Sequence, residues 1–312
     1  MTANVLFAAD PDNWPVYRHA LQNAFARAGI AADLRDDFQQ PETVDYIIYD
    51  PKSALRDFTP YTNLKAVLSL WAGVESFQHN PTLNVPLARM VDSGLREGMS
   101  DWVLGHVLRH HLGMDKHIHG QDGVWRWKES PPLARDRTVG ILGLGMLGLA
   151  VARNLSAIGF NVCGWSRAPK TVAGLDCHAG NEGLRRVLAQ SEILVLLLPA
   201  TTATENIVND ESLAALPRGA VILNPGRGTL IDDAALIAAL DRGHIAHATL
   251  DVFRTEPLPA THAYWAHPQV TVTPHIAADT RPESAAGTIA ENIRRGQADE
   301  PFLYLVDREH GY

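Results

Sequence analysis

The sequence predicts an α/β protein with two doubly wound parallel-sheet domains. A length of 312 residues favours more than one domain. Short apolar runs alternate with helical stretches in both halves of the chain, which is typical of parallel sheets covered by helices. In the second half a glycine-rich motif directly follows one apolar run and opens a helical stretch, as in doubly wound sheets that bind nucleotides.

The first half of the chain contains three predicted strands and one predicted helix. The apolar runs Val5–Ala8, Tyr46–Tyr49 and Ala66–Leu70 predict the strands. A helical pattern over about Tyr17–Ala28 lies between the first two runs and stops at Gly29. This order predicts a parallel sheet.

A long helical pattern begins at about Met99 and leads into an irregular segment, 120–137. We expect that segment to form an ordered arm in which Trp125 and Trp127 are packing anchors rather than substrate contacts. His106 and His110 have the spacing of a helical metal pair, but no third ligand lies near them in the sequence. We therefore predict no metal site and expect a hydrated or interface helix face.

The second half repeats the alternation of strands and helices. A helix is expected at Ala234–Asp241, stopped by Gly243, and another from about Glu283 to Arg294. The remaining predicted elements are the strands Thr138–Leu142, Asn161–Trp165, Ile193–Leu198, Ala220–Leu223, His247–Asp251 and Val270–Thr273 and the helix Met146–Ile158.

Composition and charge argue against several classes of protein. Hydrophobic residues make up 46% and charged residues 20% of the chain, as in an ordinary globular protein. The longest apolar run before a proline, Ile193–Leu198, is far shorter than the roughly 20 residues of a membrane-spanning helix. A net charge of −8 disfavours nucleic acid and anionic lipid as partners. The first residues lack the basic segment of a signal peptide, and Cys163 and Cys177 suggest reduced thiols, so we expect a cytoplasmic protein.

The glycine motif predicts a dinucleotide site. Gly143, Gly145 and Gly148 form G-x-G-x-x-G between the strand Thr138–Leu142 and the helix Met146–Ile158. The first glycine permits a tight turn, the second lets the backbone approach a pyrophosphate, and the third lets the helix pack on the strand. The helix N-terminus adds positive potential for the phosphates. A glycine-rich turn without a ligand is the alternative.

The residues after the next strand indicate which dinucleotide is bound. NAD-binding units carry an acid roughly 20 residues beyond the first glycine, where it binds the ribose 2′-hydroxyl. Here the strand is followed by Ser166, Arg167 and Lys170, which suit a 2′-phosphate. We therefore expect NADP(H) to be preferred, with NAD(H) possible; solvated loop cations are the alternative interpretation.

Three polar groups follow predicted strands in the same half. They are Arg227 in Asn224-Pro-Gly-Arg-Gly, Glu256 in Asp251-Val-Phe-Arg-Thr-Glu-Pro-Leu, and His275 in Thr273-Pro-His. Ligands of open α/β sheets bind at the carboxyl ends of the strands, so these side chains are expected to converge. Arg227 would bind the carboxylate of a 2-oxo acid, His275 would protonate its carbonyl oxygen, and Glu256 would keep that imidazole protonated.

These motifs resemble those of the D-isomer-specific 2-hydroxyacid dehydrogenases. Within them the chain is most similar to the glyoxylate/hydroxypyruvate reductase A group, which also matches in length, in Trp165-Ser166-Arg167 and in the closing segment 306–312. The resemblance implies a Rossmann cofactor domain over 99–275 and a flavodoxin-like substrate domain over 1–98 and 276–312, with a cleft between them. It also implies a homodimer built through the long helix and arm at about 99–137.

The resemblance further implies the roles of particular residues. The catalytic trio would be Arg227, Glu256 and His275. The substrate would be bound by Trp71, Ala72, Gly73 and Val74 together with Arg227. Asp251 would bind the nicotinamide carboxamide. The cofactor would contact Gly143, Gly145, Met146, Leu147, Gly148, Trp165, Ser166, Arg167, Lys170, Leu198, Pro199, Thr204, Pro225, Gly226, Arg227, Asp251 and His275.

Two departures from the family pattern concern the size of the pocket. Pro225 and Gly226 precede Arg227 where the family more often has Leu or Thr followed by Ala or Ser. Trp71 and Tyr49 stand near the expected substrate loop, where large aromatic rings would either restrict the site to two- or three-carbon acids or form a wall for an aryl side chain.

The leading hypothesis is therefore an NADP(H)-dependent reductase of glyoxylate and hydroxypyruvate. One alternative keeps the chemistry and changes the substrate to a bulkier 2-oxo acid, such as phenylpyruvate or a sugar-derived 2-keto acid. A second alternative is a non-catalytic dinucleotide-sensing protein. The complete set of Arg227, Glu256 and His275 argues against that second alternative.

Overall fold

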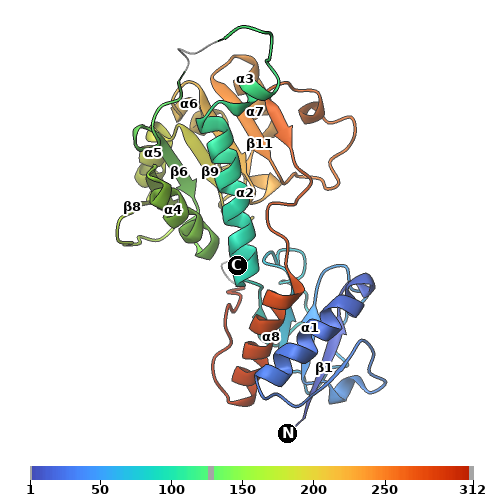
Figure 1. The fold of residues 1–312 in the computed structure, drawn as a ribbon. Coiled ribbons are helices and arrows are strands. Elements are labelled where there is room, and N and C mark those ends of the chain that lie inside the picture. Colours follow the sequence, from blue (N-terminus) through green and yellow to red (C-terminus); the bar gives the residue numbers. More distant parts are fainter. Residues whose placement is uncertain (1, 126–129, 309–312) are drawn as a thin grey trace. The chain divides into compact units, whose positions relative to one another are not determined.

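The structure is a computed structural model and describes residues 2–125 and 130–308. The chain forms two compact units (Figure 1). The first comprises the chain up to Leu95 and from Asp279 onward, and the second runs from Arg96 to Ala278. The predicted boundaries, 98/99 and 275/276, fall a few residues from these divisions; at the second boundary Ala277, which was expected in the first domain, packs in the core of the second unit.

The first unit contains a five-stranded parallel sheet in the order β2-β1-β3-β4-β5, which is the flavodoxin-like order. The strands are β1 (Ala3–Ala8), β2 (Ala32–Arg35), β3 (Tyr46–Tyr49), β4 (Ala66–Ser69) and β5 (Leu87–Ala88). The predicted parallel sheet of this unit is therefore confirmed, but the polar strand β2 and the short strand β5 were not predicted.

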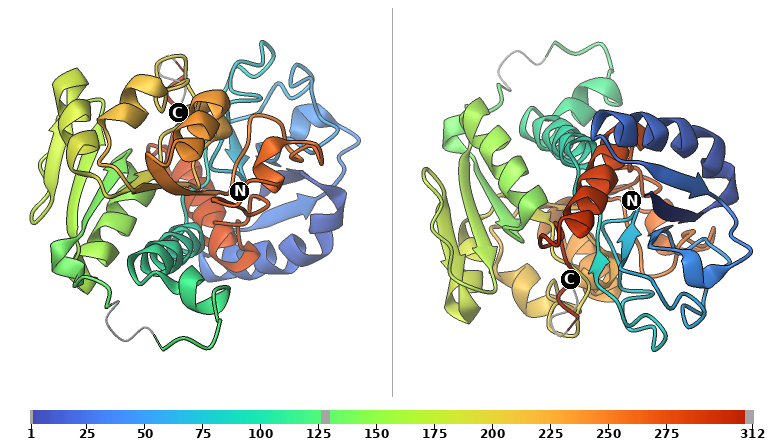
Figure 2. Two further views of the ribbon diagram at one scale, coloured as in Figure 1. Left: turned by 90° about the horizontal axis from the view of Figure 1, so that it is seen from above. Right: turned by 90° about the horizontal axis from the view of Figure 1, so that it is seen from below.

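The two faces of this sheet are covered differently. Helices α1 (Trp14–Arg27) and α8 (Pro282–Gln297) lie side by side on one face, where Leu21 and Ile289 pack with Ile48 and Leu68 (Figure 2). The other face is covered by the turns and short 3-10 segments that link the strands, which contribute Phe58, Phe77 and Leu83 among others. Those connections are too rich in Pro, Asn and Thr to continue as helices.

The second unit contains a seven-stranded sheet in the order β12-β11-β10-β9-β6-β7-β8, with every neighbouring pair parallel. The strand order reverses between β6 and β9, and ligands of such sheets bind at that switch point. The strands are β6 (Thr138–Leu142), β7 (Asn161–Ser166), β8 (Asp176–Ala179), β9 (Ile193–Leu196), β10 (Ala220–Asn224), β11 (Ile245–Leu250) and β12 (Val270–Val272). The order is that of a Rossmann domain, as predicted.

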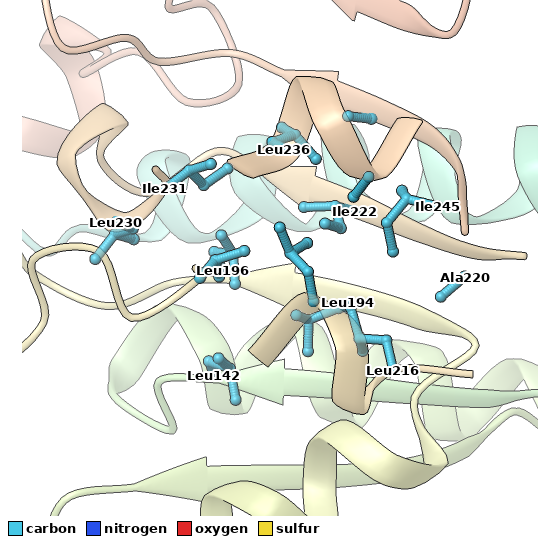
Figure 3. Packing of buried hydrophobic residues seen from close by; sticks show 14 of the residues in the cluster. Leu142, Leu194, Leu196, Leu216, Ala220, Ile222, Leu230, Ile231, Leu236 and Ile245 are labelled. Carbon is cyan, nitrogen blue, oxygen red and sulfur yellow. The ribbon is translucent and has the colours of Figure 1, made fainter. Parts of the chain in front are cut away.

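Helices cover both faces of this sheet. The alternating residues of β9 show this, because Leu194 and Leu196 join one core (Figure 3) whereas Ile193 and Val195 join another. The first core receives α5 (Gly180–Gln190), α6 (Asp210–Ala215) and α7 (Asp233–Asp241), and the second receives α2 (Ser93–His111) and α4 (Met146–Ile158). The remaining short helices are α3 (Met114–Ile118), η1 (Pro11–Asn13), η2 (Pro41–Thr43), η3 (Ala134–Asp136), η4 (Gly228–Leu230) and η5 (Ala263–Trp265).

The long helix and the arm differ from the prediction. Helix α2 begins at Ser93 rather than at about Met99, because the Asp92 carboxylate accepts the backbone N–H of Leu95 at 2.9 Å and caps the helix earlier. In the arm Trp125 is 88% exposed, so within this chain it is not a packing anchor, and Trp127 lies outside the described residues. In the described part of the chain no helix combines the length and apolarity needed to cross a bilayer.

Candidate active site

The glycine loop between β6 and α4 has the geometry of a phosphate site. Gly143 has a φ of +110°, which favours glycine, and a Cβ at Gly148 would lie 1.9 Å from the carbonyl oxygen of Gly143. A Cβ at Gly145 would meet nothing within 4 Å, so this glycine faces open space. Gly145 is also the N-cap of α4 and offers no capping side chain. The backbone donors at the start of α4 therefore suit an anionic ligand, and a dinucleotide pyrophosphate fits this loop.

The loop after β7 places one cation directly on the glycine loop. The Lys170 ammonium donates to the carbonyl oxygen of Leu144 at 2.6 Å. Ser166 is buried and its hydroxyl donates to the carbonyl oxygen of Ala168 at 2.8 Å, so this side chain shapes its own turn. Trp165 donates from Nε1 to the carbonyl oxygen of Gly180 at 2.9 Å and packs against the core. The expected cofactor contacts of Trp165, Ser166, Arg167 and Lys170 stay predictions.

The loop after β9 is held together by Thr204. Its hydroxyl donates to the carbonyl oxygen of Pro199 at 2.7 Å and accepts the backbone N–H of Thr201 at 2.9 Å. Thr204 is buried, as is Leu198. The expected cofactor contacts of Leu198, Pro199 and Thr204 stay predictions, and the structure gives Thr204 a clear role in shaping the loop.

Arg227 follows β10 on a loop that is shaped by a residue not predicted for the site. The Asn224 side chain is buried, donates to the carbonyl oxygen of Arg227 at 2.9 Å and accepts the backbone N–H of Gly226 at 3.1 Å. A Cβ at Gly226 would lie 2.8 Å from the carbonyl oxygen of Leu196, which explains the small residue before Arg227. The Arg227 guanidinium donates to the carbonyl oxygen of Gly226 at 2.7 Å.

His275 and Glu256 form the contact that the sequence predicted. His275 Nδ1 lies 2.7 Å from Glu256 Oε2, and Glu256 Oε1 accepts the backbone N–H of Phe253 at 2.8 Å. A carboxylate only accepts hydrogen bonds, so Nδ1 carries the proton of this bond and Nε2 is the nitrogen available to a substrate. The His275 side chain is 52% exposed, so a ligand can reach it.

Asp251 holds the backbone that presents His275. Its carboxylate accepts the Thr273 hydroxyl at 2.6 Å and the backbone N–H groups of Ile276 and Ala277 at 3.0 and 2.9 Å. Its carbonyl oxygen accepts the backbone N–H of His275, whose φ of 54° lies in the left-handed region. Asp251 is fully buried, so its expected contact with the nicotinamide stays a prediction, and its role in holding this loop was missed.

The expected substrate loop belongs to the first unit. Ser69 fixes its first turn, because the Ser69 hydroxyl accepts the backbone N–H of Trp71 at 2.9 Å and donates to its carbonyl oxygen at 3.0 Å. Trp71 is 40% exposed, whereas Val74 is buried in the core. Ala72 and Gly73 lie between them. The contacts of these residues with a substrate stay predictions.

Tyr49 is not a wall of the pocket. It is 2% exposed and packs between Phe58 and Phe77, with ring centroids 5.5 and 4.9 Å away. Its hydroxyl donates to the carbonyl oxygen of Leu55 at 3.2 Å. The expectation that the Tyr49 ring either restricts the pocket or forms a wall for an aryl side chain is therefore wrong, because the side chain of this β3 residue points into the core.

The histidines of α2 serve packing. His110 Nε2 lies 3.0 Å from the Thr249 hydroxyl, and the His106 ring lies 4.4 Å from the Trp102 ring. Burial lowers the pKa of His110 to about 3. Among the described residues no group of three or more His, Cys, Asp or Glu side chains is arranged to hold a metal ion.

A Rossmann sheet with an open glycine loop, and with Arg, Glu and His at the ends of neighbouring strands, defines an NAD(P)-dependent oxidoreductase. The NAD-binding domain of the D-isomer-specific 2-hydroxyacid dehydrogenases matches residues 102–277. The chain belongs to this family.

Relatives in the family match over most of their length. The glyoxylate/hydroxypyruvate reductase A of Yersinia enterocolitica is 38% identical over 302 residues, covering 94% of each chain. That of Serratia proteamaculans is 41% identical over 257 residues, covering 80% of this chain and 82% of its own.

Solved structures agree with this assignment. A D-isomer-specific 2-hydroxyacid dehydrogenase of Xanthobacter autotrophicus, in complex with NADPH and MES, has a TM-score of 0.92 and 42% identity over 99% of both chains. An NADPH-dependent glyoxylate/hydroxypyruvate reductase of Sinorhizobium meliloti, in complex with NADP and sulfate, has a TM-score of 0.85 and 34% identity over 100% of this chain and 99% of its own.

Proposed function

We propose that this protein is an NADP(H)-dependent reductase of small 2-oxo acids, which converts glyoxylate to glycolate and hydroxypyruvate to D-glycerate. The observation that carries the proposal is the 2.7 Å contact between His275 Nδ1 and Glu256 Oε2 at the carboxyl edge of a Rossmann sheet. The names of the relatives from Yersinia and Sinorhizobium support the substrate class.

The roles of the residues follow from their chemistry. When bound, the reduced nicotinamide supplies a hydride to the carbonyl carbon of the substrate. His275 donates the proton on Nε2 to the carbonyl oxygen, so that the oxo group becomes a hydroxyl group. Glu256 stabilises the protonated imidazole before the transfer, and Arg227 pairs with the substrate carboxylate.

NADP(H) is the preferred cofactor in this proposal. The loop after β7 has no acid at the position that would bind a ribose 2′-hydroxyl, and it offers Arg167 and Lys170 instead. The structures from Xanthobacter and Sinorhizobium, which contain NADPH and NADP, support this preference. NAD(H) would be the weaker cofactor because it lacks the 2′-phosphate that these cations attract.

The same proposal includes a homodimer and a place in the cytoplasm. Apolar side chains are exposed along α3 and the arm, with Ile118 62%, Val124 62%, Trp125 88% and Leu133 54% exposed. Several exposed apolar side chains on neighbouring segments of the chain are typical of a protein interface, and a second copy of the chain would cover them. The thiols of Cys163 and Cys177 are unpaired, as expected in a reducing compartment.

Initial-rate kinetics test this function directly. The panel is glyoxylate, hydroxypyruvate, pyruvate and phenylpyruvate, each with NADPH and with NADH. We expect the highest kcat/KM for glyoxylate or hydroxypyruvate with NADPH. A clear preference for phenylpyruvate would contradict the substrate class, a preference for NADH would contradict the cofactor, and binding of NADPH without turnover of any acid would contradict an enzymatic function.

A further inference from the structure

We propose that Arg254 is a positioning residue for this reaction: its side chain joins the loop that carries Glu256 to the loop that carries Arg227. The inference rests on the proposed function and adds to it a residue that touches neither substrate nor cofactor. Arg254 belongs to the segment after β11, two positions before Glu256. The contacts of its guanidinium group carry the argument.

The guanidinium binds the segment that directly follows Arg227. Arg254 Nε and Nη2 lie 3.2 and 2.7 Å from the carbonyl oxygen of Ile231, and Nη2 lies 3.3 Å from that of Thr229. Both acceptors belong to the chain that leaves Arg227 through η4. A planar guanidinium can donate from two nitrogens in fixed directions, so it orients this backbone as well as attracting it.

A third loop contacts the same guanidinium. Arg254 Nη2 donates to Oδ1 of Asn206, which lies in the loop after β9 and has a φ of 51°. The backbone N–H of Asn206 donates to the carbonyl oxygen of Thr229 at 2.9 Å. The carboxylates of Glu205 and Asp233 lie 3.7 and 3.9 Å from the guanidinium nitrogens. The loops that follow β9, β10 and β11 therefore meet at Arg254.

The backbones of two of these loops are also in direct contact. A Cβ at Gly228 would lie 2.0 Å from the carbonyl carbon of Phe253 and 2.4 Å from the nitrogen of Arg254. The Phe253 N–H in turn holds Glu256 Oε1. In the proposed reaction Arg227 binds the substrate carboxylate and His275 protonates the carbonyl oxygen. The distance between these two side chains is therefore set by Gly228, Arg254 and Glu256.

This arrangement has a consequence for catalysis. A small 2-oxo acid has its carboxylate and its carbonyl group on adjacent carbons, so Arg227 and His275 must be set at one separation to engage both. A misplacement of about 1 Å can reduce a rate by about 10²-fold. Loss of the Arg254 side chain should therefore impair the binding of substrate and the reaction more than the affinity for NADPH, because Arg254 does not contact the glycine loop or Lys170.

The test compares wild type with Arg254→Ala, with Arg254→Lys and with Arg185→Gln, a control that removes an exposed ion pair between α5 and α6. For Arg254→Ala we expect kcat for glyoxylate to fall by about 10- to 100-fold and the dissociation constant for NADPH to rise by less, no more than about fivefold. Arg254→Lys should recover little of the lost activity, because an ammonium group cannot donate from two nitrogens in fixed directions as a guanidinium does. Guanidinium ion below denaturing concentration should restore part of the activity of Arg254→Ala, whereas methylammonium should not.

A binding measurement separates this inference from the proposed function. Oxamate has a carboxylate beside a carbonyl group and does not accept a hydride, so its binding to the NADPH complex reports on positioning without turnover. We expect Arg254→Ala to weaken oxamate binding by about 5- to 50-fold and Arg185→Gln to leave it unchanged. If the wild type reduces no 2-oxo acid, the proposed function fails, while the oxamate measurement still tests Arg254. The inference would be overturned if Arg254→Ala bound oxamate as tightly as the wild type, or if the wild type did not bind oxamate. It would also be overturned if the loss of activity in Arg254→Ala were fully explained by a loss of folded protein.

Discussion

At the scale of single residues, Glu256 connects the proton donor to the backbone of its own loop. One of its oxygens faces His275 Nδ1 at 2.7 Å and the other accepts the Phe253 N–H at 2.8 Å. A carboxylate held at both oxygens cannot turn away from the imidazole without losing a hydrogen bond. The position of the imidazole is therefore set by a side chain that is itself held by its own loop.

Variants of these two side chains test the contact between them. Glu256→Gln keeps the shape of the side chain but removes the carboxylate that faces His275 Nδ1, so kcat for reduction should fall by about tenfold or more with little change in NADPH affinity. His275→Ala should lose at least about 10²-fold in kcat, also with little change in NADPH affinity. Steady-state kinetics with glyoxylate provide the measurement. A Glu256→Gln variant with the kcat of the wild type would contradict the pairing.

In the proposed reaction Arg227 contributes separately, through its charge. Arg227→Gln should raise KM for the oxo acid and lower kcat, because the substrate carboxylate loses its charged partner. The loss corresponds to about 2–5 kcal/mol in kcat/KM. Steady-state kinetics with glyoxylate and saturating NADPH provide the measurement. A variant within threefold of wild type in kcat/KM would remove Arg227 from the site.

At the scale of secondary-structure elements, the site consists of loops at the carboxyl ends of neighbouring strands. Arg227 follows β10, Glu256 follows β11, and His275 follows β12, three strands that are adjacent in the sheet. Buried polar side chains at the strand ends shape these loops: Asn224 does so after β10, and Asp251 between β11 and β12. A rigid sheet and short-range hydrogen bonds thus combine to place flexible backbone accurately.

The loop after β7 is expected to decide between the two dinucleotides. The double variant Arg167→Gln/Lys170→Gln should weaken NADPH by several-fold to about a few hundredfold and leave NADH nearly unchanged, because only NADPH has a 2′-phosphate. Dissociation constants from fluorescence titration provide the measurement. Arg185→Gln/Arg186→Gln on α5 changes the net charge equally and is the matched control. Equal weakening of NADPH and NADH would contradict this role of the loop.

At the scale of the whole molecule, buried histidines link stability to pH. Burial lowers the pKa of His110 to about 3 and that of His247 to about 4, and the two rings lie 4.9 Å apart. His106, Arg109, Asp115 and His267 are the other charged or titratable groups that act on this pair. The unfolded chain binds protons at these histidines below about pH 6.5, whereas the folded chain does so only near pH 3 to 4. The free energy of unfolding should therefore decrease as pH falls from about 6.5 toward 4.

This decrease should be smaller when both histidines are replaced. Between pH 7.5 and 5 the free energy of unfolding should decrease by about 1–3 kcal/mol more in the wild type than in His110→Gln/His247→Gln. This figure allows for the partial exposure of His247. Urea denaturation at the two pH values measures the difference, so a uniform destabilisation by the substitutions cancels. His19→Gln on the exposed side of α1 is the control. An equal acid sensitivity of the double variant and the wild type would exclude these histidines as the cause.

The exposed arm makes a prediction about assembly. Trp125→Ser should weaken the proposed dimer by at least about tenfold, because a large aromatic side chain would lose its cover in the partner. Sedimentation equilibrium over a range of concentrations gives the dissociation constant. Trp265→Ser removes a tryptophan that is 53% exposed in η5, outside the arm, and should change nothing. A monomeric wild type would contradict the dimer.

Local patterns in the sequence were sufficient to predict the main elements of the fold. Helix α4 and strands β3 and β6 have their predicted bounds, because an apolar run or an amphipathic repeat between glycines is a short-range signal. The strands β2 and β8 were missed, because their residues are polar and only partly buried at or near the edge of a sheet. The start of α2 was misplaced, because its cap at Asp92 lies before the apolar repeat begins.

The sequence alone also determined the family of the chain, and it predicts the chemistry of the site, since Arg227, Glu256, His275 and the glycine loop are residue types in short, specific motifs. Only the tertiary structure showed that Asp251 and Asn224 are buried supports of those loops, that Tyr49 belongs to the core, and that Arg254 joins three loops. Asn224 bonds within its own loop, and its burial comes from the packing around that loop. The other three depend on contacts between segments that are separate in the sequence, such as the one between Arg254 and Asn206. A motif records which side chains are present, whereas the packing of the sheet decides which of them meet.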